Sequence, residues 1–297
     1  MISAPCFAER VAHHAIMGVC EPVLDRWLIP DTFACRKGKG RIAAVARARH
    51  FARRFPFYLK LDIRKYFDSI PHGSLLARLE KRFKDRRVLD SFAQIMRSFR
   101  GKLGRGLPIG SLTSQHFANF YLGWFDRVMK ETWRLPGYVR YMDDMAIWSR
   151  DRSELRRTEE RAGEWLREEL GLELKPMPYG NRVAAGMDFL GCRVFPTHGT
   201  LNRRGRVRLR RKLAGLQFEF EQGELTEPEF QVRATAIMGF ATAAGVSSWR
   251  TRRSVVDRLG EPVSRLEPRE PRRRLEQQRQ ELPVGEPQRE RPVEPEQ

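Results

Sequence analysis

The amino-acid sequence predicts an α+β fold in which helices pack on an antiparallel sheet. Three features predict it: long segments with helical apolar spacing, a short strand that carries Asp62, and an apolar segment interrupted by Asp143 and Asp144. Residues 138–148 have apolar residues on both sides of the two acids, which predicts a β-hairpin with two carboxylates at its tip. The 297 residues can form one large domain or two small ones.

The remaining elements follow from apolar periodicity and from glycine and proline positions. Helices are predicted at residues 13–29, 42–54, 114–130, 153–170 and 227–244, with two basic amphipathic helices between 74 and 99. Pro56 opens the strand that carries Asp62, and short strands are predicted at 172–175 and 189–195. Glycines and a proline predict a loop at 101–110. Residues 263–297 are rich in Glu, Arg, Pro and Gln, so we expect a disordered charged tail there.

The composition indicates a polyanionic partner. The formal net charge is +19, and much of the excess is arginine, which suits bidentate contacts to phosphate. Nucleic acid is the simplest such partner. The alternative is a protein that is basic for another reason, as some ribosome-associated or secreted proteins are.

The cysteines favour a reducing compartment. Cys6, Cys20, Cys35 and Cys192 are scattered and have no CxxC spacing, so neither a zinc site nor a disulfide framework is expected. No segment approaches the apolar length of a membrane span, and the N-terminus lacks the hydrophobic run of a signal peptide. The sequence therefore predicts a cytoplasmic protein with no membrane partner.

The acidic residues predict a metal site. Two adjacent carboxylates repel each other unless a cation neutralises them, and a divalent metal is the natural counter-ion. Asp62, Asp143 and Asp144, brought together from two strands, would hold a pair of Mg²⁺ ions, as in phosphoryl and nucleotidyl transfer. The alternative is an ordinary exposed Asp-Asp turn.

Two motifs resemble those of reverse transcriptases. Tyr141-Met142-Asp143-Asp144 is similar to the most diagnostic motif of that family, and Asp62 followed five residues later by Phe67 is similar to its first catalytic motif. The resemblance implies a right-hand polymerase fold with partial fingers, a palm of antiparallel sheet plus helices, and a helical thumb. It implies N-terminally incomplete fingers at 1–55, a palm with inserted fingers helices at 56–195, a thumb at 196–262 and the tail at 263–297. Because the chain begins within the family's first motif, we expect a misassigned start codon or a truncated gene.

The resemblance also implies a role for each motif. Asp62, Asp143 and Asp144 would be the catalytic acids that hold two Mg²⁺ ions, with Mn²⁺ as a substitute, and would serve attack by the primer 3′-hydroxyl. Phe67 would lie against the sugar of the incoming nucleotide and leave no room for a 2′-hydroxyl. Its alternative is a core aromatic beside Tyr66. Lys175 is a candidate general acid for the leaving pyrophosphate, or else a surface lysine.

Several basic and glycine-containing segments would contact nucleotide or nucleic acid. Arg36, Lys37, Lys39 and Arg41 form a cationic turn that would grip the triphosphate, the alternative being a solvated basic loop. Phe189, Leu190 and Gly191 resemble the primer-grip turn. A cationic face suited to an RNA–DNA duplex follows, made of Arg203, Arg204, Arg206, Arg208, Arg210 and Arg211.

The segment 108–115 distinguishes among reverse transcriptases. Group II intron enzymes carry Gln-Gly here and end in Ser-Pro, whereas this chain has Ile109-Gly110 and ends in Ser114-Gln115. This variant, with His13-His14-Ala15 and the glycine-punctuated turn at 36–40, resembles the enzymes of diversity-generating retroelements. Those enzymes copy a template RNA with errors at adenines. The implied partners are template RNA, a DNA or RNA primer, dNTPs and a small basic accessory protein.

A physical argument connects this segment to fidelity. Ile109 in place of a polar glutamine removes a hydrogen bond that could hold template or nucleotide in register, which lowers the penalty for a mispair. The alternative is that Ile109 only packs. Two other functions stay open: a group II-intron-like or antiphage-defence reverse transcriptase, and a truncated, non-catalytic RNA-binding relic.

Overall fold

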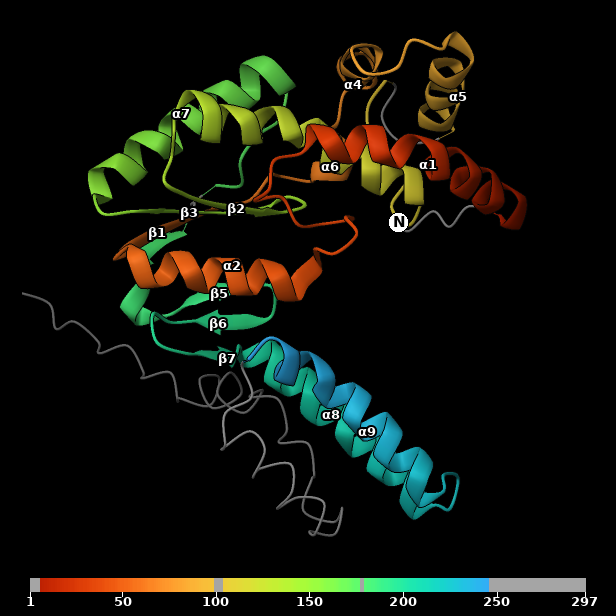
Figure 1. Ribbon diagram of the computed structural model, residues 1–297, viewed down its shortest axis with the longest axis vertical. Helices are drawn as coiled ribbons and strands as arrows, with labels where there is room; N and C mark the ends of the chain where they lie inside the picture. Colours follow the sequence, from red (N-terminus) through yellow and green to blue (C-terminus); the bar gives the residue numbers. More distant parts are fainter. Residues whose placement is uncertain (1–5, 99–103, 177–178, 246–297) are drawn as a thin grey trace, which may run out of the picture. The chain divides into compact units, whose positions relative to one another are not determined.

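The structure is a computed structural model that describes residues 6–98, 104–176 and 179–245. The predicted tail at 263–297, the last part of the predicted thumb and residues 101–103 of the predicted loop lie outside these ranges. Within them the chain forms the elements shown in Figure 1. The helices are α1 (Phe7–Trp27), α2 (Gly40–Arg54), α3 (Tyr66–Ser69), α4 (His72–Glu80), α5 (Arg86–Arg97), α6 (Leu112–Arg127), α7 (Arg152–Leu170), α8 (Arg203–Glu221) and α9 (Glu227–Ala243). The strands are β1 (Phe57–Leu61), β2 (Gly137–Tyr141), β3 (Asp144–Ser149), β4 (Tyr179–Arg182), β5 (Met187–Phe189), β6 (Cys192–Val194) and β7 (Gly199–Leu201).

The central sheet has the strand order β2-β3-β1-β4, and its neighbours are antiparallel. β2 and β3 form a hairpin in which Tyr141 is paired with Asp144. β1 lies on the other side of β3, with Leu61 opposite Met145. The predicted hairpin with acids at its tip is therefore confirmed, and the register brings the end of β1 to that tip.

Alternation along the strands divides the apolar residues into two cores. Leu59, Leu61, Met145 and Ile147 face a core that they share with α1 and α4 to α7. The intervening residues, such as Trp148, face a second core that they share with α2, β5 to β7, α8 and α9. Figure 1 shows the sheet between these two layers. Both faces of the sheet are thus buried, which holds its strands rigidly.

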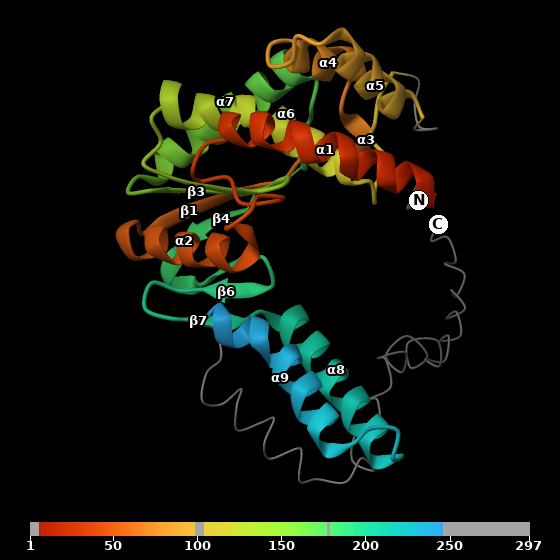
Figure 2. The same cartoon turned by 45° about the vertical axis from the view of Figure 1, so that its right-hand side comes forward.

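A second sheet, of order β5-β6-β7, packs against α2 and is followed by two helices. α8 and α9 lie side by side in both views (Figures 1 and 2). α8 begins where the Asn202 side chain accepts a hydrogen bond from the backbone of Gly205, an N-cap arrangement. Its buried Leu209, Leu213 and Leu216 recur at helical spacing. One face of α8 therefore packs against the protein, and the arginines of α8 are exposed.

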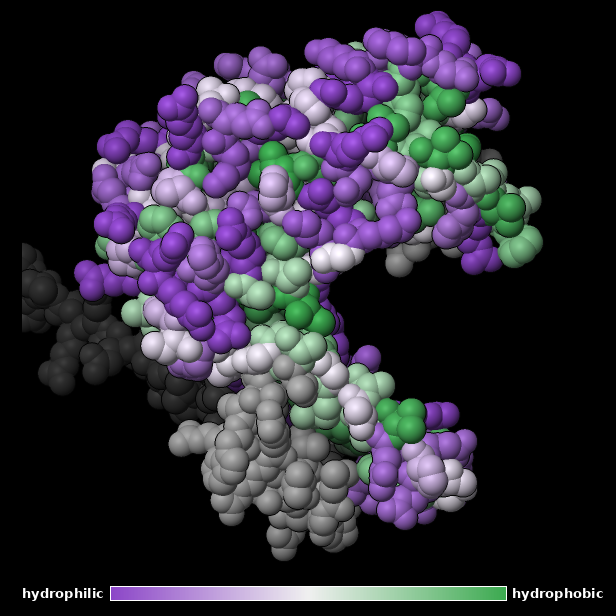
Figure 3. Space-filling model, in the orientation of Figure 1, coloured by the Kyte–Doolittle hydropathy of each residue, from purple (hydrophilic) through white to green (hydrophobic). Residues whose placement is uncertain are grey.

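The predicted helices are confirmed, with shifted ends. α1 begins at Phe7 instead of residue 13, and α6 continues into a π-helix at Val128–Thr132. In α1, Phe7, Val11 and Val19 remain exposed, and Figure 3 shows apolar side chains at this end of the helix. Residues 7–12 are all exposed, so the apolar periodicity that marks a buried helix face starts only after them in the sequence.

Two strand predictions were wrong. Residues 172–175 form no strand and make one isolated bridge, between Leu174 and Ile63, while β4 at 179–182 was not predicted. Residues 189–195 are two strands instead of one, because Leu190 and Gly191 turn the chain with φ values of +49° and +82°. A glycine accepts that conformation readily, and it separates β5 from β6. None of the helices that the structure describes is long and apolar enough to cross a membrane.

Candidate active site

Three aspartates converge at one end of the central sheet. Met142 and Asp143 form the two-residue turn between β2 and β3, and Asp144 is the first residue of β3. Asp62 directly follows β1, whose last residue, Leu61, is opposite Met145. In this antiparallel register the next pair after Leu61 and Met145 is Asp62 and Asp144, so these two aspartates lie next to each other. The structure therefore brings the three predicted catalytic residues together.

Two lysines pair with these acids. Nζ of Lys175 lies 2.7 Å from Oδ2 of Asp62, and the backbone N–H of Lys175 donates to the Asp62 carbonyl at 2.8 Å. Nζ of Lys60 lies 3.1 Å from Oδ1 of Asp144. Lys175 was predicted to be part of the site, whereas Lys60 was not. The period-2 alternation of β1, which puts Lys60 and Asp62 on one face, could have revealed it.

Burial and mutual repulsion raise the pKa of both hairpin aspartates. For Asp143 desolvation is the largest cause, and the charges of Asp62 and Asp144 add to it. For Asp144 desolvation again dominates and is opposed by the ammonium of Lys60. The hydrogen bond to Asp62 raises the pKa of Lys175, which keeps that lysine protonated. A cation among these carboxylates would lower the repulsion that raises their pKa.

The donor set suits a divalent cation, although the side chains are not closed around one. Among the described residues, no three His, Cys, Asp or Glu side chains form a group that could hold a metal ion as they stand. However, Oδ1 of Asp62 is buried and accepts no hydrogen bond, and the buried Oδ1 of Asp144 is paired with the Lys60 ammonium at 3.1 Å. Carboxylate oxygens are the ligands that Mg²⁺ prefers. These residues therefore fit Mg²⁺ chemically.

Phe67 lies beside the loop that carries Ile109. Its ring is half-buried against the core and meets the Tyr66 ring edge-on at 5.7 Å between centroids. Tyr66 is the buried partner, since its hydroxyl donates to the Ala118 carbonyl. The backbone N–H of Leu107 donates to the Phe67 carbonyl at 2.8 Å. The first acidic motif and the 104–110 loop are thus joined at Phe67.

The four cations of the 36–41 turn have different surroundings. Arg36 points inward: it pairs with Asp25 at 2.6 Å and donates to the carbonyls of Ile29 and Thr32. Lys39 donates to the Pro30 carbonyl. The Arg41 guanidinium stacks on the ring of Phe240 in α9, 3.4 Å from its centroid. The remaining cation, Lys37, is 91% exposed and 3.8 Å from Glu21, so it is the one best placed to meet a soluble ligand.

The 108–115 segment is held by residues from two other predicted motifs. Oγ of Ser111 lies 2.9 Å from Nδ1 of His13 in α1, and Sγ of Cys35 donates to Oε1 of Gln115 at 3.4 Å. Ile109 is 40% exposed, and Gly110 adopts a φ of +108°. Ile109 is therefore only partly covered by the protein, and its side chain is accessible from solvent.

The predicted primer-grip turn and part of the cationic face border one cavity of about 660 Å³. Leu190 and Gly191 line it from the β5–β6 turn, and Arg204, Arg208 and Lys212 line it from one face of α8, together with Arg41 and Phe240. Arg206 instead donates to the Leu201 carbonyl. Arg203, Arg210 and Arg211 are exposed and are not part of the lining. Lys212 was not predicted, although its spacing of four residues from Arg208 puts it on the same face.

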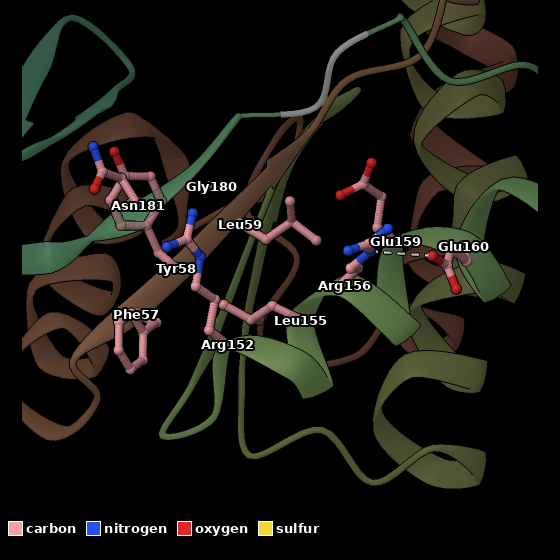
Figure 4. A pocket seen from close by; sticks show the side chains of 10 residues that line it. All are labelled: Phe57, Tyr58, Leu59, Arg152, Leu155, Arg156, Glu159, Glu160, Gly180 and Asn181. Atoms are coloured by element: carbon pink, nitrogen blue, oxygen red, sulfur yellow. Dashed lines mark ion pairs between the residues drawn. The ribbon is translucent and has the colours of Figure 1, made fainter.

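Another cavity, of about 370 Å³, lies at the opposite end of β1 (Figure 4). Phe57 and Leu59 of β1, Asn181 of β4 and Arg152 of α7 contribute to its lining. Arg156 and Glu160, which also line it, form an ion pair with each other at 3.5 Å. Because Asp62 follows the far end of β1, this cavity is separate from the three aspartates.

Comparisons with known proteins agree with this geometry. Residues 1–194 match the family described as reverse transcriptase (RNA-dependent DNA polymerase). The "Putative COX1/OXI3 intron 2 protein" of Saccharomyces cerevisiae is 26% identical over 131 residues, which are 41% of this chain and 15% of that protein.

Solved telomerase structures from Candida tropicalis have a similar fold. The apo enzyme matches with a TM-score of 0.53 and 12% identity, over 83% of this chain and 54% of its own. The enzyme in complex with the TWJ fragment of telomeric RNA matches with a TM-score of 0.50 and 11% identity, over 82% of this chain and 47% of its own. The chain thus spans about half of each telomerase chain, and the likeness confirms the predicted right-hand polymerase fold. Since the family match covers 194 of the 297 residues, the chain belongs to the reverse transcriptase family.

Proposed function

We propose that this protein is an active RNA-templated DNA polymerase that extends a primer with dNTPs. The observation that carries the proposal is the convergence of Asp62, Asp143 and Asp144 at one end of the sheet, where Oδ1 of Asp62 is buried without a hydrogen bond and burial raises the pKa of both hairpin aspartates. A non-catalytic relic has no need to keep three carboxylates in such a costly arrangement.

The site residues have separate tasks in this reaction. Asp62, Asp143 and Asp144 would hold the Mg²⁺ ions, which when bound neutralise charge on the triphosphate and favour ionisation of the primer 3′-hydroxyl. Lys175 holds a proton beside Asp62, from where it can protonate the leaving pyrophosphate. Phe67 excludes the 2′-hydroxyl of a ribonucleotide, and Lys37 meets the triphosphate. Leu190, Gly191 and the α8 arginines bind the primer and its duplex.

We also propose that the enzyme is of the diversity-generating type, with a template RNA and a small basic accessory protein as partners. The contacts of Ser111 with His13, and of Gln115 with Cys35 just before the 36–40 turn, support this, because they bring together the three segments on which that resemblance rests. In the same proposal, fingers, palm and thumb divide near residues 55 and 195.

A second candidate is an intron-type reverse transcriptase. The yeast protein that matches this chain carries the word intron in its name, which favours this candidate. The two differ in fidelity. The diversity-generating type would misincorporate mainly opposite template adenines, whereas the intron type is expected to show no such bias toward adenine.

Primer extension on an RNA template with Mg²⁺ and dNTPs tests the proposal. Wild type is compared with Asp143→Asn and with Asp68→Asn, an exposed aspartate one residue beyond Phe67. We expect Asp143→Asn to lower the rate more than about 100-fold, since it removes a metal ligand, and Asp68→Asn to extend normally. Wild type that extends no primer, with or without accessory protein, would favour the relic. Sequencing the products separates the two types of enzyme.

A further inference from the structure

We infer that Arg140, paired with Asp126, is a positioning residue that fixes the turn bearing the catalytic aspartates and the segment that precedes the basic turn. This inference rests on the proposed function for its catalytic consequence. Arg140 is the next-to-last residue of β2 and Asp126 the next-to-last residue of α6. Neither was expected from the sequence to matter, and both are fully buried.

All five N–H groups of the Arg140 guanidinium have acceptors. Nε and Nη2 each donate to one oxygen of Asp126 at 2.6 Å, in a bidentate pair. Nη2 also donates to the Asn119 carbonyl, and Nη1 donates to the Asn119 side chain and to the Met142 carbonyl, each at 2.9 Å. A planar fork with five fixed donors fits these acceptors in one orientation only.

Asp126 is satisfied to the same degree. Its Oδ1 also accepts from the hydroxyl of Tyr138 at 2.7 Å, and its Oδ2 accepts from Thr32 at 2.6 Å. With the two bonds from Arg140, each carboxylate oxygen therefore accepts two hydrogen bonds. A buried ion pair of this kind adds little net stability compared with apolar side chains, so its value lies in the geometry that it imposes.

The bond to the Met142 carbonyl acts directly on the active site. Met142 has a φ of +57°, a left-handed conformation that side-chain-bearing residues seldom adopt. It is the residue before Asp143, and a rotation of its peptide would move the Asp143 carboxylate. Arg140 holds the carbonyl of this strained residue and thereby fixes where the carboxylate points.

The same residue holds the segment before the basic turn. The backbone N–H of Arg140 donates to the Asp31 carbonyl, and the Arg140 carbonyl accepts from Phe33, both at 3.0 Å. Asn119, itself bonded to Arg140, donates to the Ala34 carbonyl at 2.7 Å. Residues 31–34 lead into the turn with Lys37. The Arg140 side chain thus holds the metal-binding turn, while its backbone and the Asn119 side chain connect that turn to the segment proposed to meet the triphosphate.

The test compares Arg140→Lys with Tyr121→Phe. Lysine keeps the positive charge but cannot make the bidentate pair and reach the Met142 carbonyl together. Tyr121→Phe is the matched control, because it removes buried hydrogen bonds of the same helix, to Ser74 and Leu170, without touching Arg140. We expect Arg140→Lys to lower kcat and Mn²⁺ affinity, measured by electron paramagnetic resonance, by about 10- to 100-fold with a nearly unchanged KM for dNTPs.

The control should lose thermal stability but keep kcat and Mn²⁺ affinity. The inference is overturned if Arg140→Lys keeps both quantities, or if Tyr121→Phe loses them equally at the same loss of Tm. Should Arg140→Lys not fold, Asn119→Ala is the second variant. It keeps the ion pair with Asp126 but removes the Asn119 side-chain oxygen, which accepts from the same Nη1 that donates to the Met142 carbonyl. Asn119→Ala should lower kcat and Mn²⁺ affinity less strongly than Arg140→Lys. If Asn119→Ala has the wild-type kcat and Mn²⁺ affinity, the inference is also overturned.

The two proposals can fail separately. Suppose that wild type extends no primer yet binds Mn²⁺, and that both Asp143→Asn and Arg140→Lys weaken this binding. The positioning role of Arg140 is then supported, and the proposed polymerase activity is refuted. If wild type extends primers and Arg140→Lys matches it in rate and Mn²⁺ affinity, the activity holds while positioning fails.

Discussion

Oγ of Ser111 lies 2.9 Å from Nδ1 of His13, so the loop that carries Ile109 is anchored to α1. Ser111 is buried and also bonds Thr113 at 2.8 Å, which ties the hydroxyl into the start of α6. Burial lowers the pKa of His13, so the imidazole stays neutral at pH 7 and its Nδ1 can accept a hydrogen bond from the Ser111 hydroxyl. Anchored in this way, the loop presents an exposed Ile109 and a φ-positive Gly110 at a defined position.

Replacing Ile109 with glutamine should raise fidelity. The amide would restore a hydrogen bond near the nascent base pair, and the 40% exposure of Ile109 leaves room for it without repacking the core. We expect errors opposite template adenine to fall by about 10-fold, because the net free energy of one hydrogen bond corresponds to roughly that ratio. The measurement is deep sequencing of cDNA made on a defined RNA. Ile109→Leu, which restores no hydrogen bond, should keep the wild-type error rate, and an equal gain in fidelity from it would refute this explanation.

Shortening Phe67 should admit ribonucleotides. Phe67→Val removes the ring that would meet a 2′-hydroxyl, while Tyr66 and its bond to Ala118 stay in place. The ratio of kcat/KM for dNTP over rNTP should fall about 10- to 100-fold, mostly through better use of rNTPs. Single-nucleotide kinetics provide the measurement. A ratio that stays constant while both rates fall would mean that Phe67 only supports the core.

Removing the Lys175 ammonium should slow chemistry without weakening metal binding. Lys175→Gln deletes the proton held beside Asp62, and general-acid catalysis of this kind contributes about 100-fold or more. Lys60→Gln is the comparison, since Lys60 pairs with Asp144 but has no proposed proton to give. Rapid-quench rates over a range of pH would separate the two. Equal rate losses in both variants would indicate that each lysine serves only as a counter-ion.

Metal and pH should act on stability through the hairpin aspartates. A carboxyl whose pKa is raised on folding favours the folded state below its ordinary pKa of 3.8, and this contribution is lost as the pH rises through the folded-state pKa. Metal-free Asp143→Asn should therefore melt about 2 to 4 °C above wild type at pH 7 and show no such gain below pH 3.8.

Mg²⁺ should raise the Tm of wild type at pH 7 more than that of Asp143→Asn, because only the wild type regains the lost stability when a cation binds. Scanning fluorimetry in Mg²⁺ and in a chelator measures both effects. K⁺ at matched ionic strength is the control. A Tm gain that is the same in both proteins would place the ion elsewhere.

Arg204 and Arg208 should contribute to the salt dependence of duplex binding. Both line the cavity next to Leu190 and Gly191, so each is expected to neutralise a phosphate. Changing either to glutamine should reduce the slope of log K against log salt by about 0.7 to 0.9. Arg233→Gln is the control, because Arg233 pairs with Glu219 at 3.1 Å and does not line this cavity. Fluorescence anisotropy with an RNA–DNA hybrid gives the slopes, and an equal effect in the control would indicate a nonspecific loss of charge.

Much of the fold and the acids of the candidate site could be predicted from local sequence patterns. Apolar periodicity located most helices, and alternation around Asp143 located the hairpin, because these signals depend on local spacing alone. The sequence did not separate β5 from β6, since glycine permits the left-handed conformation of Gly191 without requiring it and leucine seldom adopts the one found at Leu190. It also missed α8 as a single helix, where dense charge obscured the recurring leucines.

Which partner each charged residue faces depends on long-range packing and could not be predicted from the sequence. Arg36 and Lys37 are neighbours in one basic run, yet Arg36 is folded inward onto Asp25 while Lys37 is exposed. Arg140 of β2 is a further case, because four of its five acceptors come from α6 and the fifth from the catalytic turn, which meet only in the folded chain. Residue type fixes which hydrogen bonds a side chain is able to make, but burial and long-range packing determine which of them form.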